Sequence, residues 1–96
     1  MSYNITRRVE DDIVALARRC GLKQAILFGS RARGDNRERS DIDLAIRGGN
    51  TAEFIASADD EIYTLLMFDI VDLDKPVQAE LLTEIRRDGV MLYEKV

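Results

Sequence analysis

Helix-like and strand-like segments alternate along the whole of this 96-residue chain. In the first kind, apolar side chains recur every three or four residues; the second kind consists of short, mainly apolar runs that end near glycine or proline. This order predicts an α/β fold, a small mixed β-sheet flanked by helices, in a single domain over residues 1–96. We expect helices over about residues 5–20, 30–36, 51–66 and 76–88, and strands over 24–28, 41–46, 67–73 and 90–93.

Local signals set the expected ends of these segments. Asn4 or Thr6 can cap the first helix, and Gly21 is well placed to stop it. Pro76 suits the first turn of the last helix. In the helix over 51–66 we expect one apolar face, formed by Phe54, Ile55, Ala58, Ile62, Leu65 and Leu66.

The composition excludes several classes of protein. With 46% hydrophobic and 33% charged residues, the chain matches a soluble globular protein. It lacks an apolar run near the ~20 residues of a membrane span and lacks a signal-peptide pattern, so we expect no membrane association and a cytoplasmic location. A single cysteine and no histidine exclude an internal disulfide, a structural zinc site and histidine-based catalysis.

The net charge of −4 argues against stable binding to nucleic acid, because such affinity comes mainly from neutralising phosphates. The arginines of residues 31–39 are an exception within this acidic chain. Taken alone they are most simply interpreted as a solvated loop. Their position between a Gly-Ser turn and two aspartates makes a local anionic ligand a stronger interpretation.

The stretch from Gly29 to Asp43 carries the chemistry. Asp41 and Asp43 lie two residues apart on an expected strand, where side chains alternate between the faces, so they point the same way, about 6–7 Å apart. Magnesium held by one or two carboxylates plus substrate phosphates is a common reason for such an arrangement. Gly29 and Ser30 offer backbone N–H groups and a hydroxyl to the same phosphates. The stretch therefore predicts a site for a metal and a nucleoside triphosphate.

A third carboxylate is expected from the strand over 67–73, where Asp69 and Asp72 face opposite sides. Asp69 is favoured because Val71, its neighbour on that face, is apolar, as Ala45 is beside the first pair. Asp72 can be explained as an acid at the end of a strand. Asp-x-Asp or Gly-Ser alone is a weak signal, but the ordered set is specific.

These residues resemble the minimal nucleotidyltransferases of the DNA polymerase β-like superfamily. That family's pattern is Gly-Ser, ten residues, then Asp-x-Asp, and Gly29-Ser30 with Asp41-Ile42-Asp43 matches it without departure. The segment 68–72 resembles the family's later acid-bearing strand, and 85–93 resembles its ending. The resemblance implies the nucleotidyltransferase fold over nearly the whole chain.

The resemblance also implies an activity. Minimal proteins of this kind are similar to the antitoxins of HEPN/nucleotidyltransferase toxin–antitoxin pairs, which transfer AMP from ATP to a hydroxyl, typically of a tyrosine, on the HEPN ribonuclease. By this resemblance Asp41, Asp43 and Asp69 would hold Mg²⁺, and Asp69 would help deprotonate the acceptor. Gly29 would allow close backbone approach and Ser30 would bond the terminal phosphates. The triphosphate charge would be offset by Arg31 or Arg33.

Two alternatives stay open at this point. The chain could be a non-catalytic antitoxin that neutralises its toxin by forming a complex. It could also modify RNA, which the acidic balance and the short chain disfavour. The sequence leaves the nucleotide preference, the acceptor residue and homo- or hetero-oligomerisation undetermined.

Overall fold

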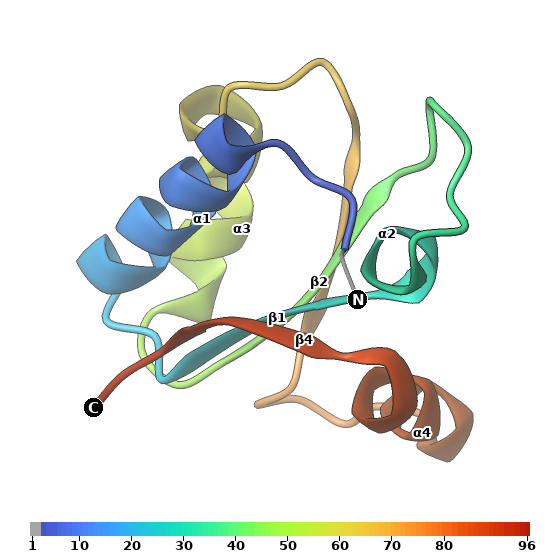
Figure 1. Cartoon of the computed structure of the whole chain (residues 1–96). Coiled ribbons are helices and arrows are strands. Elements are labelled where there is room, and N and C mark those ends of the chain that lie inside the picture. Colours follow the sequence, from blue (N-terminus) through green and yellow to red (C-terminus); the bar gives the residue numbers. More distant parts are fainter. Residues whose placement is uncertain (1–2) are drawn as a thin grey trace.

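The computed structural model describes residues 3–96, which form four helices and four strands (Figure 1). Helices and strands alternate along the chain as the sequence predicts. In chain order they are α1 (Arg7–Arg19), β1 (Gln24–Phe28), α2 (Gly29–Arg33), β2 (Ile42–Arg47), α3 (Thr51–Glu61), β3 (Phe68–Asp72), α4 (Ala79–Asp88) and β4 (Val90–Glu94).

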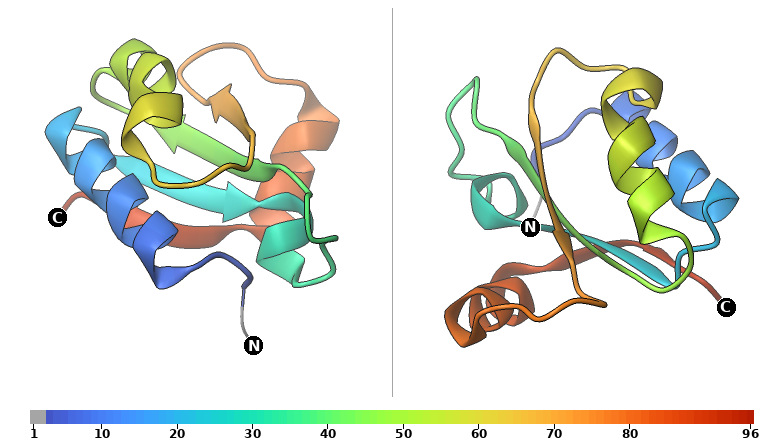
Figure 2. Two further views of the ribbon diagram at one scale, coloured as in Figure 1. Left: turned by 90° about the horizontal axis from the view of Figure 1, so that it is seen from above. Right: turned by 180° about the vertical axis from the view of Figure 1, so that it is seen from behind.

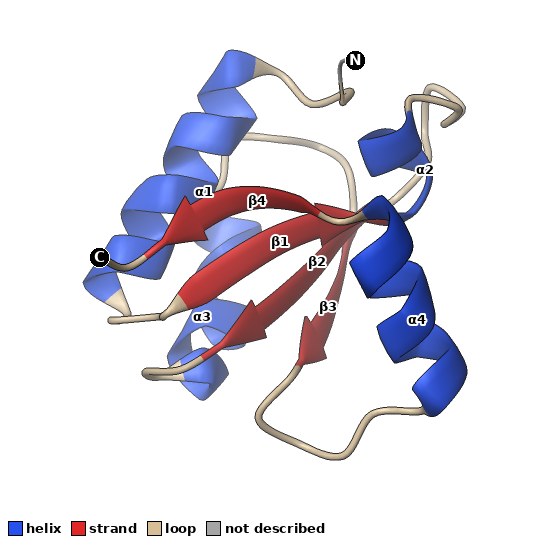
Figure 3. Ribbon diagram, turned by 60° about the horizontal axis from the view of Figure 1, so that its bottom comes forward, coloured by secondary structure: helices blue, strands red, loops and turns tan. Residues whose placement is uncertain are grey.

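The four strands make one mixed sheet in the order β3-β2-β1-β4 (Figure 3). β1 runs antiparallel to both of its neighbours, β2 and β4, whereas β2 and β3 are parallel. The small mixed sheet flanked by helices is therefore confirmed. The parallel pair is the part that matters for function, because register partners on adjacent strands carry their side chains on the same face, about 4.8 Å apart.

The two faces of the sheet carry different helices. Figures 1 and 2 show α1 and α3 together on one face and α4 on the other. Ile42, Leu44 and Ile46 of β2 point into the main core under α1 and α3. On the opposite face Ala45 packs with Phe28 of β1 and with α4. This confirms the expected alternation along residues 41–46, with the aspartates on the face away from the main core.

The first helix follows its local signals. Thr6 is the N-cap, since its hydroxyl accepts a hydrogen bond from the Val9 N–H (3.2 Å). At the other end Gly21 takes φ +67°, the left-handed conformation that stops a helix. Of the two capping residues that the sequence allowed, Thr6 caps the helix.

The helix expected over residues 51–66 was predicted too long. α3 ends at Glu61, and Ile62 is extended (φ −102°, ψ 124°). The Tyr63 N–H donates to a carboxylate oxygen of Asp12 (2.9 Å) instead of continuing the helix. The run of acids at 59–61 opposes the helix dipole at this end, which helps to explain the early stop.

The apolar face expected for that helix needs the same correction. Phe54, Ala58 and Ile62 are buried, but Leu65 is fully exposed and Ile55 is 42% exposed. Leu65 lies beyond the end of α3, where helical spacing no longer decides which side chains face the core, whereas Ile55 lies within α3 on its exposed side.

Two shorter boundaries also differ from the prediction. α2 ends at Arg33 and not near Asn36, because Gly34 takes φ +85°. α4 begins at Ala79, so Pro76 precedes the helix; the residue at its N-cap position, Gln78, is still extended (ψ 143°). None of the helices formed by residues 3–96 has the length and apolar character needed to cross a bilayer.

Candidate active site

Two aspartates lie side by side at the end of the sheet where β2 and β3 begin, and a third, Asp41, comes just before them in the chain. Asp43 and Asp69 are register partners in the parallel pair, so their side chains leave the sheet side by side on the α4 face. Asp41 lies two residues before Asp43 and directly before the first residue of β2. The structure thus pairs Asp43 with Asp69, and Asp41 is near enough for its charge to act on Asp43.

Asp72 occupies the opposite face. It pairs with Ile46 in the ladder, accepts a hydrogen bond from the Thr51 hydroxyl (2.8 Å) and accepts another from the Asp74 N–H (3.0 Å). The Asp72 carboxylate therefore bonds to the start of α3 and to the turn after β3. Of the two candidates for the third carboxylate, Asp69 is the one beside Asp43.

The environment of Asp43 disfavours its negative charge. Burial, followed by the charges of Asp69 and Asp41, raises the pKa of the half-buried Asp43 carboxyl from 3.8 to about 6. Glu84 of α4 adds to this effect, and Arg33 opposes it. Repulsion among like charges at this density is what a bound cation would relieve.

Gly29 lies directly against this carboxylate. Its φ of +72° is left-handed, and a Cβ added there would collide with the Asp43 side chain. Glycine is needed on both counts, for the backbone conformation and for the close approach. Ser30 follows in the first turn of α2 and is half-buried. The Gly-Ser turn and the aspartates therefore meet, as the spacing predicts.

The two arginines of α2 have different surroundings. Arg33 is partly exposed and donates to the carboxylates of Asp35 (3.0 Å) and Asp88 (3.1 Å). Arg31 is buried, with only 6% of its surface exposed, and donates to three backbone carbonyls. Of the two arginines that the sequence offered as alternatives at the triphosphate, only Arg33 thus has an exposed guanidinium, and its charge acts on Asp43.

Sequence reasoning missed the contribution of α4. Glu84 raises the pKa of Asp43, and Asp88, one turn further along, holds Arg33. The pKa of Asp88 is kept below its usual range by hydrogen bonds from Arg87 and then Arg33. Glu84 and Asp88 are four residues apart, so the sequence shows that they share a helix face. It does not show whether that face points toward the aspartates or into solvent.

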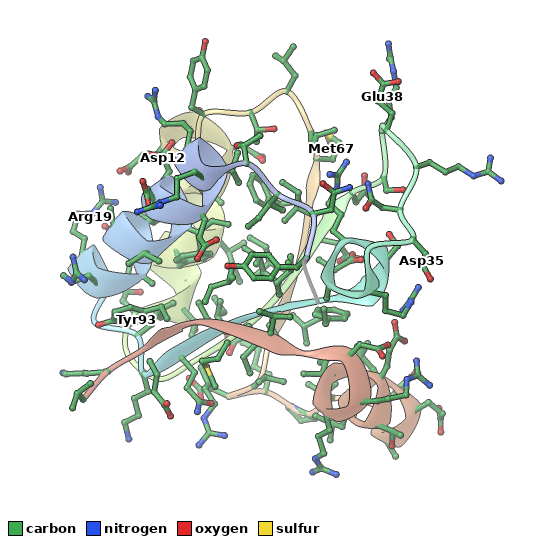
Figure 4. The ribbon with its side chains drawn as sticks, viewed as in Figure 1. Asp12, Arg19, Asp35, Glu38, Met67 and Tyr93 are labelled. Atoms are coloured by element: carbon green, nitrogen blue, oxygen red, sulfur yellow. The ribbon has the colours of Figure 1, made fainter. Side chains whose placement is uncertain are left out.

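Asp41 and Asp69 are exposed and Asp43 is partly exposed, so the site is open to solvent. Two hollows of about 400 and 450 Å³ lie elsewhere: one at the opposite end of the sheet beside Lys23 and Arg47, the other between Arg39 and Met67. Figure 4 shows Glu38 and Met67 on the two segments that flank this second hollow.

Among residues 3–96, no three or more His, Cys, Asp or Glu side chains are grouped so that they could hold a metal ion. Magnesium needs only one or two carboxylates when substrate phosphates complete its shell. Two adjacent carboxylates on neighbouring strands, with hard oxygen donors and no histidine nearby, suit that cation better than zinc.

Comparison with known protein families identifies the chain. A model of the family described as Polymerase beta, Nucleotidyltransferase matches residues 12–96. The chain belongs to this nucleotidyltransferase family. The matched range includes β1, the Gly-Ser turn, all three aspartates and the C-terminal strand.

Two solved structures related to this nucleotidyltransferase are toxin–antitoxin complexes. One is a crystal structure of a toxin–antitoxin with AMP-PNP, with 29% identity and a TM-score of 0.67, covering 90% of this chain and 73% of that chain. The other is the toxin–antitoxin MntA-HpeT, in a mutant form with two aspartates, two positions apart, replaced by glutamate. It has 27% identity, a TM-score of 0.66 and the same coverage of 90% and 73%.

A third structure supports the fold alone. It is a protein assigned as a nucleotidyltransferase from Sulfolobus solfataricus, 20% identical, with a TM-score of 0.52, covering 92% of this chain and 82% of that chain. No curated protein sequence matches the chain at a significant level.

Proposed function

We propose that this protein is a Mg²⁺-dependent nucleotidyltransferase that transfers AMP from ATP to a hydroxyl, typically of a tyrosine, on a HEPN ribonuclease toxin, and thereby acts as its antitoxin. The observation that carries the proposal is the pairing of Asp43 with Asp69 across β2 and β3, with the Gly29 backbone against the Asp43 carboxylate. The family to which the chain belongs supports the same chemistry.

The donor set fits magnesium. Asp41, Asp43 and Asp69 offer hard carboxylate oxygens, and the raised pKa of Asp43 reflects its burial and, after that, the negative charges of Asp69 and Asp41. In the proposed enzyme these three residues hold the cation together with substrate phosphates. When bound, Mg²⁺ neutralises the triphosphate and polarises the phosphoryl oxygens.

The side chains around the cation have separate roles in this proposal. Ser30 and the backbone N–H groups of the Gly-Ser turn hold the terminal phosphates, and Gly29 leaves room for them. Arg33 offsets the triphosphate charge by exchanging one of its present partners, Asp35 or Asp88, for a phosphate oxygen.

The reaction itself is a displacement at the α-phosphorus. The acceptor oxygen forms a bond to that phosphorus, the bond to the β-phosphate oxygen breaks, and pyrophosphate leaves. The hydroxyl proton passes to a carboxylate, for which we propose Asp69. Positioning and charge neutralisation supply most of the acceleration in such transfers, so neither histidine nor a covalent intermediate is required.

Two observations support a toxin protein as the partner: the related structures and one exposed segment of this chain. Both 27–29% identical relatives are toxin–antitoxin complexes, and one contains AMP-PNP, an analogue of ATP. The pair of replaced aspartates in the second has the same spacing as Asp41 and Asp43. In this chain Tyr63, Leu65 and Met67 expose large apolar side chains next to the start of β3, as a protein-binding surface would.

Transfer can be tested with a candidate HEPN partner protein. Incubation of the two proteins with ATP and Mg²⁺ should add the mass of AMP to the partner, as measured by intact-mass spectrometry. Asp41→Asn and Asp43→Asn should abolish the addition while the variants stay folded. Asp72→Asn, on the opposite face of the sheet, is the matched control and should retain transfer.

The same variants separate catalysis from simple occlusion. If the Asp41→Asn/Asp43→Asn double variant neutralises the toxin as well as the wild type does, the protein acts as a non-catalytic antitoxin. Unchanged AMP transfer by both single variants would refute the proposed role of these aspartates.

A further inference from the structure

Arg31 is the only polar or charged residue that is buried within residues 3–96. Each of its three guanidinium nitrogens donates to a backbone carbonyl. Nε reaches Ser40 O (2.9 Å), Nη1 reaches Asn4 O (3.1 Å) and Nη2 reaches Glu38 O (2.9 Å). Three of the five guanidinium N–H groups are thus held by carbonyls, and the side chain is buried, so in this arrangement Arg31 is bonded to the protein and does not extend into solvent where a phosphate would bind.

These bonds join three segments of the chain. Asn4 belongs to the segment before α1, Arg31 to α2, and Glu38 and Ser40 to the α2–β2 loop. The Asn4 N–H donates back to Arg31 O (2.8 Å), so the first two segments are bonded in both directions. Figure 1 shows the N-terminal segment passing beside α2, with the loop rising from the other end of that helix. Arg31 therefore fixes the loop to the body of the protein.

The loop matters because it leads directly to Asp41. Asp41 is exposed and precedes the first residue of β2, so the β-ladder begins only after it. On its C-terminal side the Ile42 N–H donates to Met67 O (2.9 Å). On its N-terminal side the adjacent carbonyl, that of Ser40, accepts from Arg31. The position of Asp41 relative to Asp43 therefore depends on one anchor on each side.

We propose that Arg31 is a positioning residue: by holding the carbonyls of Glu38 and Ser40 it fixes the loop that places Asp41 beside Asp43. The inference rests on the proposed role of Asp41 in holding the metal and triphosphate. It replaces direct contact between Arg31 and the triphosphate, which the sequence had allowed.

Geometry, rather than charge, is what this role requires. Lysine carries the same charge and is a good phosphate ligand, but its compact ammonium cannot meet three carbonyls placed around a planar fork. Arg31→Lys therefore distinguishes the two roles. This variant should keep the wild-type ligand binding if Arg31 contacts phosphate, and should lose it if Arg31 positions the loop.

The experiment compares Arg31→Lys and Arg31→Met with the same two substitutions at Arg39, an exposed arginine of the same loop. The first readout is amide hydrogen exchange at Arg37 and Ser40, whose N–H groups bond to Ser40 Oγ (2.9 Å) and Arg37 O (3.1 Å). Both Arg31 variants should exchange these amides about tenfold faster or more, since hydrogen bonds to a charged group are lost. The Arg39 variants should match the wild type.

The second readout is binding of Mn²⁺, followed by electron paramagnetic resonance, with and without AMP-PNP. Both Arg31 variants should bind Mn²⁺ about tenfold more weakly in the presence of AMP-PNP, in keeping with the usual effect of losing a residue that orients a ligand. Affinity for AMP-PNP in EDTA should not change. A residue that only stabilised the fold would lower the melting temperature without altering the Mn²⁺ affinity of the folded protein.

Several outcomes would overturn the proposal. One is that Arg31→Lys keeps the wild-type amide protection of the loop and the wild-type Mn²⁺ affinity. Another is that Arg31→Met, but not Arg31→Lys, binds AMP-PNP more weakly in EDTA. The third is that the loop amides exchange at the wild-type rate in both variants. If neither variant folds, the test is made on the wild-type protein by NMR. Rotation of the Arg31 guanidinium should be slow, and free rotation would refute the hydrogen bonds to the loop. If the wild type binds no Mn²⁺ even with AMP-PNP, the proposed function fails, while hydrogen exchange still decides whether Arg31 holds the loop.

Discussion

Replacing Asp43 with asparagine should make the metal-free protein more stable at neutral pH while removing its activity. The carboxyl is half-buried beside Asp69 and Asp41, and its pKa is raised from 3.8 to about 6. At about 1.4 kcal/mol per pH unit, ionising this group in the folded state costs at most roughly 3 kcal/mol. Because the group is only partly buried, solvent screening reduces this to about 1–2 kcal/mol. Asparagine has nearly the same shape and no charge, so the variant avoids this cost.

The sign of the effect follows from linkage. A carboxyl whose pKa is higher in the folded than in the unfolded chain binds its proton more tightly when folded, so protonation favours folding. This stabilisation is present below about pH 4, is lost as the pH rises from 3.8 to about 6, and is absent above that range. The gap in stability between Asp43→Asn and the wild type should therefore open between about pH 4 and 6 and stay constant above pH 7.

Urea unfolding followed by circular dichroism at several pH values measures this gap. The control is Asp72→Asn, because Asp72 accepts hydrogen bonds from the Thr51 hydroxyl and the Asp74 N–H. This variant should be less stable than the wild type by about 1 kcal/mol. If Asp43→Asn is destabilised at pH 7.5, or if its gap from the wild type does not change with pH, then burial and neighbouring charge do not destabilise the Asp43 carboxylate.

The remaining predictions concern the turn, the cation and the partner surface. Gly29→Ala should destabilise the protein by more than the roughly 1–2 kcal/mol of left-handed strain and should weaken Mn²⁺ binding, because its Cβ meets Asp43. Gly21→Ala, with φ +67° and no atom near its Cβ, should show the strain alone in urea unfolding. Mg²⁺ with AMP-PNP should raise the melting temperature of the wild type in thermal denaturation by more than that of Asp43→Asn. Leu65→Ser should weaken binding to the proposed toxin partner in isothermal titration calorimetry with no loss of stability, because Leu65 is fully exposed.

The strands and the faces of their side chains could be predicted from the sequence because period-two alternation is a local property. Residues 24–28 form β1 as expected, and Asp43 and Ala45 share the face opposite Leu44. The end of α3 could not be predicted in this way. Helical spacing continues through Leu65 in the sequence, but Tyr63 N–H bonds to Asp12, which is far away in the chain.

The carboxylate site was predictable only in part. The spacing of Asp41 and Asp43 shows that they share a face, and Val71 beside Asp69 gave a reason to prefer that acid over Asp72. The pairing of Asp43 with Asp69 requires β2 and β3 to be parallel neighbours in this register, which is a tertiary fact. Glu84 could not be found from the sequence, since nothing local shows that α4 lies close enough for Glu84 to act on Asp43.

The arginines of Gly29-Ser30-Arg31-Ala32-Arg33-Gly34 show where sequence reasoning stops. Two residues apart on a helix differ by about 200° in direction, so the spacing indicates that Arg31 and Arg33 cannot both face one ligand. It does not say which of them turns inward, because the two have nearly the same neighbours in the sequence. That choice goes with the carbonyls of Asn4, Glu38 and Ser40, which accept hydrogen bonds from the Arg31 guanidinium. The inward arginine is therefore selected by backbone groups in two other segments. It shapes the site through the loop that carries Asp41, and the outward arginine is left beside Asp43.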